Sequence, residues 1–267
     1  MRIARVFPRK TRATPTDALA FWGPPGLFPP EIDCVHISVT FSWDLNLAEY
    51  YASTWQKIAP VEIGGPATGM RGEEFTPGLY LRHGYTITSR GCPERCWFCD
   101  VWKRDGNIRE LTIHEGWNVL DDNLLACSEI HIRSIFSMLK RQTRKVEFSG
   151  GFQAERLQQW HVDLLVDLKP EQMFFAYDEE RDYDPLVAAS QMLREAGFNR
   201  KQMRCYCLIG YPKDTMDAAE KRLRQCLQLG FFPMAMLWRN RRGDRDPQWM
   251  SFQRQWARPA SIYAMAK

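Results

Sequence analysis

The stretch of sequence that decides the fold is residues 85–100, YTITSRGCPERCWFCD. It opens with a β-like run, Tyr85–Ser89, and continues into three cysteines, Cys92, Cys96 and Cys99, with the spacing C-x3-C-x2-C. Three thiolates on one short loop are soft ligands, which favour an iron–sulfur cluster or zinc over hard cations. The stretch therefore predicts a metal-binding loop directly after a strand.

Downstream of this loop, β-like runs recur and alternate with helical patterns. The runs are Trp117–Leu120, Val146–Ser149, Met173–Tyr177, Arg204–Ile209 and Pro233–Trp238. Ser128, Asp184 and Thr215 stand where helix N-caps are expected. Repeated βα units predict an α/β fold with a parallel sheet. Together with Tyr85–Ser89 the runs make six strands, which indicates a partial (β/α)6 parallel barrel, since a full eight-unit barrel needs about 250 residues for itself.

Upstream of the loop the pattern is different. Val35–Phe41 and Val61–Ile63 are expected strands on either side of a helix at Leu45–Ile58, so residues 31–67 form a small N-terminal βαβ unit. The first 30 residues are rich in proline and lack periodicity, which predicts an extended arm. We therefore expect two domains: residues 1–80, with the arm and the βαβ unit, and residues 81–267, with the partial barrel and a basic C-terminal tail.

The composition excludes several classes of protein. A hydrophobic content of 45% and a charged content of 25% are average for globular proteins, and exclude a disordered, collagen-like or coiled-coil chain. The longest apolar run, Phe231–Trp238, is far shorter than the roughly 20 residues of a membrane helix. No secretory signal pattern opens the sequence, so we expect a cytoplasmic protein without membrane contact. The net charge of +4 tolerates a polyanionic partner without requiring one.

A [4Fe-4S] cluster takes four ligands, and no fourth cysteine lies near the loop. Cys34 is far upstream and Cys127 is well downstream. An iron without a protein ligand is an open coordination position, by the same logic that leaves one position free in catalytic zinc sites. Structural zinc sites instead use four protein ligands, so the triad favours a cluster, with zinc as the alternative.

At this point the sequence resembles the radical S-adenosylmethionine (radical SAM) enzymes, over roughly residues 80–240. Their hallmark is C-x3-C-x2-C with an aromatic residue before the last cysteine, here Phe98. The resemblance implies that Cys92, Cys96 and Cys99 bind a [4Fe-4S] cluster, that S-adenosyl-L-methionine chelates the fourth iron, and that Phe98 contacts adenine.

Further segments are similar to the family's cofactor contacts. Gly150 and Gly151 stand in the place of its Gly-Gly-Glu motif, with Phe152 where the acid is expected. The resemblance implies that the glycine backbone holds the methionine end, that Asp178 meets the ribose, and that Ile209 packs on adenine. Barrel enzymes place such residues at the carboxyl ends of strands.

The activity implied by the resemblance is reductive cleavage of S-adenosylmethionine to a 5′-deoxyadenosyl radical, which abstracts hydrogen from an unidentified substrate. An oxidoreductase or transferase of this class takes electrons from an external flavodoxin- or ferredoxin-type reductant. The chain resembles a short phage or prophage branch of the family, and its N-terminus resembles a truncated cobalamin-binding domain. Residues 31–67 supply two strands and one helix, too little to enclose a corrin, so cobalamin binding is not expected.

Two other functions stay open. One is a zinc-stabilised nucleic-acid-binding protein, built on the triad and on a basic tail whose Trp249, Phe252 and Trp256 could stack on bases. Their spacing is also that of one helix face packed on the barrel, which we favour. The other is a tRNA methylthiotransferase-like enzyme, which needs a second group of three clustered thiols, and the sequence shows none. Cys205 and Cys207 share one strand face and are expected to be small buried residues, with a second metal site or a redox pair as alternatives.

Overall fold

The computed structural model of the protein describes residues 1–258 and 262. The chain divides into two compact units, residues 1–116 with 241–243, and residues 117–240 with 244 onward. Lys267, part of the expected basic tail, lies outside the described residues. The domain boundary near residue 80 stays a prediction.

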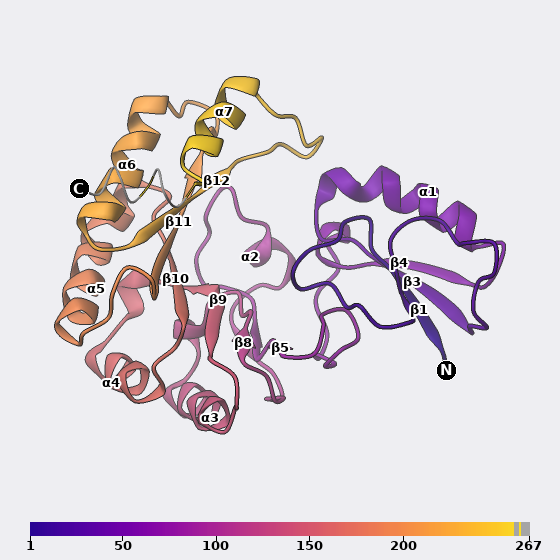
Figure 1. The fold of residues 1–267 in the computed structure, drawn as a ribbon, viewed down its shortest axis with the longest axis horizontal. Coiled ribbons are helices and arrows are strands. Elements are labelled where there is room, and N and C mark those ends of the chain that lie inside the picture. Colours follow the sequence, from indigo (N-terminus) through magenta and orange to yellow (C-terminus); the bar gives the residue numbers. More distant parts are fainter. Residues whose placement is uncertain (259–261, 263–267) are drawn as a thin grey trace. The chain divides into compact units, whose positions relative to one another are not determined.

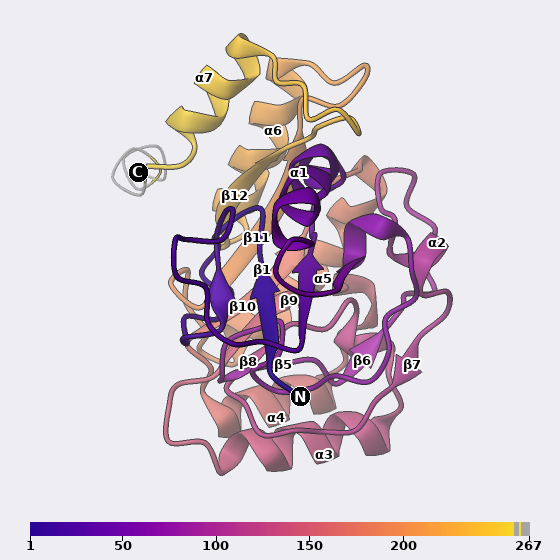
Figure 2. The ribbon, with the colours of Figure 1, turned by 90° about the vertical axis from the view of Figure 1, so that its right-hand side faces the viewer.

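The first unit is built on a parallel four-stranded sheet in the order β2-β1-β3-β4. Its strands are β1 (Ile3–Val6), β2 (Ala20–Phe21), β3 (Cys34–Ser38) and β4 (Val61–Gly64). Helix α1 (Leu45–Trp55) joins β3 to β4, within the stretch expected to form a βαβ unit (Figure 1), and Figure 2 shows this helix nearly end-on. Ala48 and Trp55 of this helix are buried with Val35 and Ile37 of β3, and form the core of the unit.

The N-terminal arm differs from the expectation. Residues 3–6 form a strand that lies between β2 and β3, and Ala4 and Val6 are fully buried. Ile3 is aligned with Cys34, and Val6 with Ile37. A four-residue run is too short to show periodicity, and its partner lies about 30 residues away in the sequence, so only the tertiary pairing identifies it as a strand.

The cysteine loop of the first unit is enclosed by short elements. They are β5 (Tyr85–Thr86), β6 (Ser89–Arg90), α2 (Val101–Arg104) and β7 (Arg109–Glu110). The single strand expected at Tyr85–Ser89 is therefore two short strands. β6 pairs with β7 in antiparallel fashion, with Ser89 opposite Glu110. This ladder was not expected from the sequence, because two residues carry no alternation.

The second unit contains a parallel sheet in the order β12-β11-β10-β9-β8 (Figure 1). Its strands are β8 (Asn118–Val119), β9 (Glu147–Phe152), β10 (Gln172–Ala176), β11 (Met203–Ile209) and β12 (Phe232–Leu237). Each overlaps a strand expected from the sequence, so the parallel α/β fold is confirmed. Closure into a partial barrel stays a prediction.

Helices follow the strands of the second unit. They are α3 (Glu129–Lys140), α4 (Gln159–Leu168), α5 (Tyr183–Glu195), α6 (Met216–Gln228) and α7 (Pro247–Gln255). The described residues of both units together also contain five 3-10 helices, at 42–44, 66–68, 124–126, 154–156 and 180–182. The caps at Ser128 and Thr215 are confirmed, since their side chains accept hydrogen bonds from the backbone N–H groups of His131 and Ala218. α5 begins one residue before Asp184, so Asp182 is its N-cap residue. Within the described residues, every helix is too short or too polar to cross a membrane.

The C-terminal helix uses its aromatic residues for packing. Phe252 and Trp256 are buried, and the side-chain amide of Gln253 donates a hydrogen bond to the carbonyl of Ala235 on β12 at 2.8 Å. Trp249 packs edge to face against Phe252, with ring centroids 5.7 Å apart. These contacts confirm the packed helix face and leave Phe252 and Trp256 unable to stack on bases.

Candidate functional site

The three predicted ligand cysteines lie on one loop of the first unit, between β6 and β7. The N–H of Cys92 donates to the carbonyl of Gly106 at 3.0 Å, and the N–H of Cys99 donates to the carbonyl of Cys96 at 3.2 Å. The indole N–H of Trp102 also donates to the carbonyl of Cys96, at 3.0 Å. All three thiols are partly exposed, and none forms a disulfide. The donor set therefore fits a group that takes three thiolates from one loop.

The entry to the loop requires glycine. Gly91 has a φ of +89°, a region that L residues rarely adopt. A Cβ atom at this position would stand 2.8 Å from the carbonyl carbon of Asn107 and 2.8 Å from the carbonyl oxygen of Gly106. The two ends of the loop approach each other here, immediately before Cys92.

Asp105 fastens the far end of the loop, and the sequence did not single it out. Its carboxylate is buried, accepts a hydrogen bond from the N–H of Gly72 at 2.8 Å, and pairs with the Nε of Arg104 at 2.7 Å. Arg109 donates to the carbonyl of Gly72. Because Gly72 is 33 residues away in the sequence, no local signal could have identified Asp105 as a positioning residue.

Phe98 is partly exposed on the same loop. Its ring meets that of Trp97 edge to face, with centroids 5.4 Å apart, and Trp97 is 47% exposed. The loop therefore presents two aromatic rings, those of Trp97 and Phe98, next to the cysteines. The contact of Phe98 with adenine stays a prediction.

The other predicted site residues belong to the second unit, where they follow neighbouring parallel strands. Gly150 and Gly151 lie in β9, Asp178 follows β10, and Ile209 ends β11. The phenol of Tyr206 on β11 donates to the carbonyl of Ser149 at 3.4 Å. The structure thus brings these four residues to the carboxyl edge of one sheet, the place that barrel enzymes use for substrate.

The two glycines are explained by the fold itself. A Cβ on Gly150 would stand 2.5 Å from the backbone nitrogen of Asp121 and 2.9 Å from the carbonyl carbon of Leu120, so glycine lets β9 approach that segment. Gly151 has a φ of +113°. Between Phe148 and Phe152 the register against β10 shifts, which marks a β-bulge. A role of the glycine backbone in holding methionine stays a prediction.

Asp178 links β10 to β11. Its Oδ1 accepts a hydrogen bond from the N–H of Leu208 at 2.7 Å. Burial raises the pKa of Asp178 to about 7, although the Leu208 hydrogen bond opposes the shift. A carboxyl group with this pKa can exchange a proton near neutral pH. Its contact with ribose stays a prediction.

Ile209 is fully buried, and its carbonyl accepts a hydrogen bond from the N–H of Trp238 at 2.9 Å. The loop after it is held by Asp214, whose carboxylate accepts from the N–H of Gly210 at 2.8 Å and pairs with Arg222 at 2.9 Å. Asp214 and Arg222 were not expected from the sequence. The adenine contact of Ile209 stays a prediction.

A second group of three thiols is present, contrary to the sequence analysis. Cys205, Cys207 and Cys226 are buried in the second unit, and their sulfur atoms lie within 4.8 Å of one another. The sequence could not show this group, because Cys226 comes from a different element. These cysteines are not the ones with the C-x3-C-x2-C spacing.

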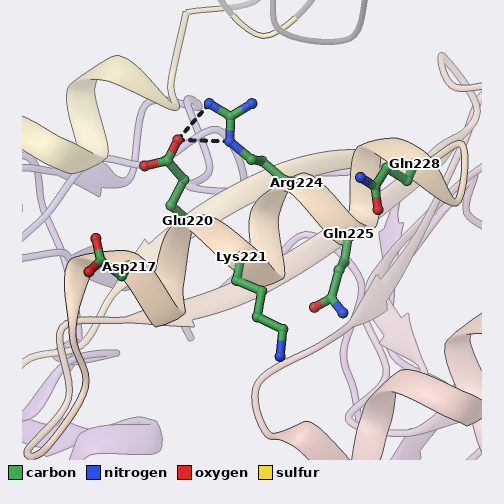
Figure 3. Close-up of a pocket in the computed structure, with 6 residues that line it drawn as sticks. All are labelled: Asp217, Glu220, Lys221, Arg224, Gln225 and Gln228. Atoms are coloured by element: carbon green, nitrogen blue, oxygen red, sulfur yellow. Dashed lines mark hydrogen bonds and ion pairs between the residues drawn. The ribbon is translucent and has the colours of Figure 1, made fainter.

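A shallow depression lies along the outer face of α6 (Figure 3). It is lined by Asp217, Glu220, Lys221, Arg224, Gln225 and Gln228. Glu220 and Arg224 pair with each other at 2.6 Å. One helix supplies every lining side chain, and their charges balance, so this depression is a solvated helix face.

No protein-family model matches the sequence, and no curated protein is significantly similar to it. Among the solved structures that are similar to this chain are two enzymes. One is coproporphyrinogen III oxidase (HemN) from Escherichia coli, a radical SAM enzyme, at 13% identity and a TM-score of 0.39 over 55% of this chain and 36% of that one. The other is the cobalamin-dependent S-adenosylmethionine radical enzyme OxsB, at 12% identity and a TM-score of 0.44 over 88% of this chain and 48% of that one. The chain spans less than half the length of each.

Proposed function

We propose that the protein is a radical SAM enzyme. The observation that carries the proposal is the loop with the C-x3-C-x2-C spacing, whose three thiols are partly exposed, unbridged and held between the β6–β7 ladder and Asp105. Soft sulfur ligands in this number suit an iron–sulfur cluster with one open iron. The proposal includes closure of the strands into a partial (β/α)6 barrel and a cytoplasmic location.

In this proposal, Cys92, Cys96 and Cys99 hold three irons of a [4Fe-4S] cluster, and S-adenosylmethionine occupies the fourth. When bound, these two groups supply the chemistry of the class, reductive cleavage of S-adenosylmethionine and hydrogen abstraction from an unreactive C–H bond. Gly91 and Asp105 hold the two ends of the loop that carries the three thiols. Phe98, Gly150, Gly151, Asp178 and Ile209 are the proposed contacts to S-adenosylmethionine. The electron donor is an external one-electron reductant of flavodoxin or ferredoxin type.

The test is anaerobic reconstitution followed by measurement of iron, sulfide and 5′-deoxyadenosine release with dithionite. The wild type is expected to hold about four irons and four sulfides per chain. Cys92→Ala, Cys96→Ala and Cys99→Ala should each abolish release. Cys34→Ala and Cys127→Ala, on cysteines outside the loop, are the matched controls and should retain it. Full release from any of the three loop variants would refute the assignment.

The same measurements decide between the proposal and the alternatives. Stoichiometric zinc without sulfide would instead support a zinc-stabilised protein. That protein would lack the aromatic platform expected for nucleic-acid binding, because Phe252 and Trp256 are buried. A methylthiotransferase-like activity needs a second cluster, and the sulfur spacing of Cys205, Cys207 and Cys226 suits a single ion better.

A further inference from the structure

Three sulfur atoms meet between strand β11 and helix α6 of the second unit. Cys205 and Cys207 lie on the buried face of β11, where every second residue is buried. Cys226 lies on the buried face of α6 with Leu223 and Leu227. The Sγ atoms of Cys207 and Cys226 are 3.4 Å apart, and all three sulfurs lie within 4.8 Å of one another.

The spacing suits one metal ion. With a Zn–S bond of about 2.3 Å, two sulfur ligands of one tetrahedral zinc lie about 3.8 Å apart. In a cubic cluster each cysteine binds a different iron, so its cysteine sulfurs stand farther apart than ligands of one ion. The Cys207–Cys226 sulfur distance of 3.4 Å, and the limit of 4.8 Å on the other two pairs, therefore fit a mononuclear site with small adjustments.

The three side chains are already ordered. Each has no measurable solvent exposure, and each is held in a strand or a helix by the packing of the core. The N–H of Phe231 donates to the carbonyl of Cys226 at 2.9 Å, which fixes the end of α6. A site on rigid elements needs little ordering when an ion binds. Packing of small residues is enough to explain two cysteines on one face of β11. A metal site requires in addition that a third sulfur comes close from another element, and Cys226 of α6 supplies it.

A positive charge lies beside the sulfurs. Arg222 is one helical turn before Cys226 and only 7% exposed, and its charge acts on Cys207 and Cys226. Its Nη2 donates to the carbonyl of Leu208 at 3.0 Å and to Asp214. Its buried Nε has no hydrogen-bond partner among the described residues. Three thiolates on a divalent ion carry one net negative charge. Asp214 already balances the charge of Arg222, so the guanidinium offsets the charge of the site only in part.

We propose that Cys205, Cys207 and Cys226 bind a single thiophilic metal ion of the zinc class through three thiolates, in place of the four protein ligands usual in structural zinc sites, and that this ion fastens α6 to β11. Binding forms three metal–sulfur bonds and releases the three thiol protons to water, with no change of oxidation state. Because the site is closed to solvent, the ion enters as the chain folds.

The test uses the full chain with Cys92→Ser, Cys96→Ser and Cys99→Ser, so that the loop triad contributes nothing. This background variant is refolded with zinc chloride, dialysed, and examined by native mass spectrometry. One zinc per chain is expected. Cys226→Ala and, separately, Cys207→Ala on this background should reduce the content to zero. Cys127→Ala is the matched control and should retain one zinc.

Thermal unfolding in the presence and absence of zinc checks that the variants fold. Zinc should raise the unfolding temperature of the background variant and leave that of Cys226→Ala unchanged. Absence of zinc from the folded background variant, or retention of one zinc by both alanine variants, overturns the proposal. Because the loop cysteines are removed, the result is independent of the proposed radical SAM function.

Discussion

Replacement of Asp178 by asparagine should change how the stability of the second unit depends on pH. The carboxyl Oδ1 of Asp178 accepts the N–H of Leu208 at 2.7 Å, and an asparagine carbonyl can accept the same hydrogen bond. Burial raises the pKa of Asp178 from 3.8 to about 7 in the folded protein. In the unfolded chain the group ionises near its ordinary value, so unfolding releases a proton between these two pH values.

The sign and size follow from this difference. The contribution of Asp178 to the free energy of unfolding is largest below pH 4 and falls as the pH rises towards 7, because ionisation favours the unfolded chain. A shift of about three pH units corresponds to at most ~4 kcal/mol, at 1.36 kcal/mol per unit. Asp178→Asn should therefore gain stability relative to the wild type by up to ~4 kcal/mol between pH 4 and pH 8.

Denaturant unfolding followed by circular dichroism at several pH values, in metal-free buffer, measures this difference. The comparison of variant with wild type cancels the titration of all other groups. A difference that stays constant from pH 4 to pH 8 would refute the reasoning, since a constant offset reflects only the new amide.

The remaining predictions concern a histidine, a glycine and a helix cap. Burial lowers the pKa of His161 to about 4, and its Nδ1 accepts a hydrogen bond from the N–H of Gln158 at 2.9 Å. Below pH 6.5 the unfolded chain therefore binds a proton that the folded protein does not, and the wild type should lose about 3 kcal/mol of stability as the pH falls from 6.5 to 4. His161→Gln should abolish that loss in the same unfolding assay, and an unchanged acid slope would contradict the assignment. Gly150→Ala should lower the unfolding temperature, because its Cβ would stand 2.5 Å from the backbone nitrogen of Asp121, whereas Gly26→Ala, with open space around it, should leave that temperature unchanged. Thr215→Ala should lower the free energy of unfolding by about 1 kcal/mol, since the hydroxyl accepts a hydrogen bond from the N–H of Ala218 at the start of α6. A change near zero in denaturant unfolding would contradict this and would show that water replaces the cap.

Features that depend on neighbouring residues in the sequence were predictable. The β-like run Arg204–Ile209 predicted β11, and the Thr215 cap with the apolar spacing behind it predicted α6. The cysteine loop was identified for the same reason, because all its ligands lie within eight residues.

Features that depend on distant partners were not predictable. Asp105 is an ordinary acid until Gly72 is placed beside it, and Cys226 is a core residue until β11 brings two more sulfurs to it. The sequence analysis assigned Gly150 to contact with S-adenosylmethionine. In the structure, the close approach of the Asp121 backbone explains why this position has no side chain. In each case the missing information is a tertiary contact that leaves no local pattern in the sequence.

The position of β1 inside the sheet of the first unit has a practical consequence for expression. Both neighbours of β1 follow it in the chain, so the strand is paired on both sides only after β3, which ends at Ser38, has been synthesised. Removal of residues 1–30 would delete β1 together with β2, and would leave the edge of β3 unpaired and open to aggregation.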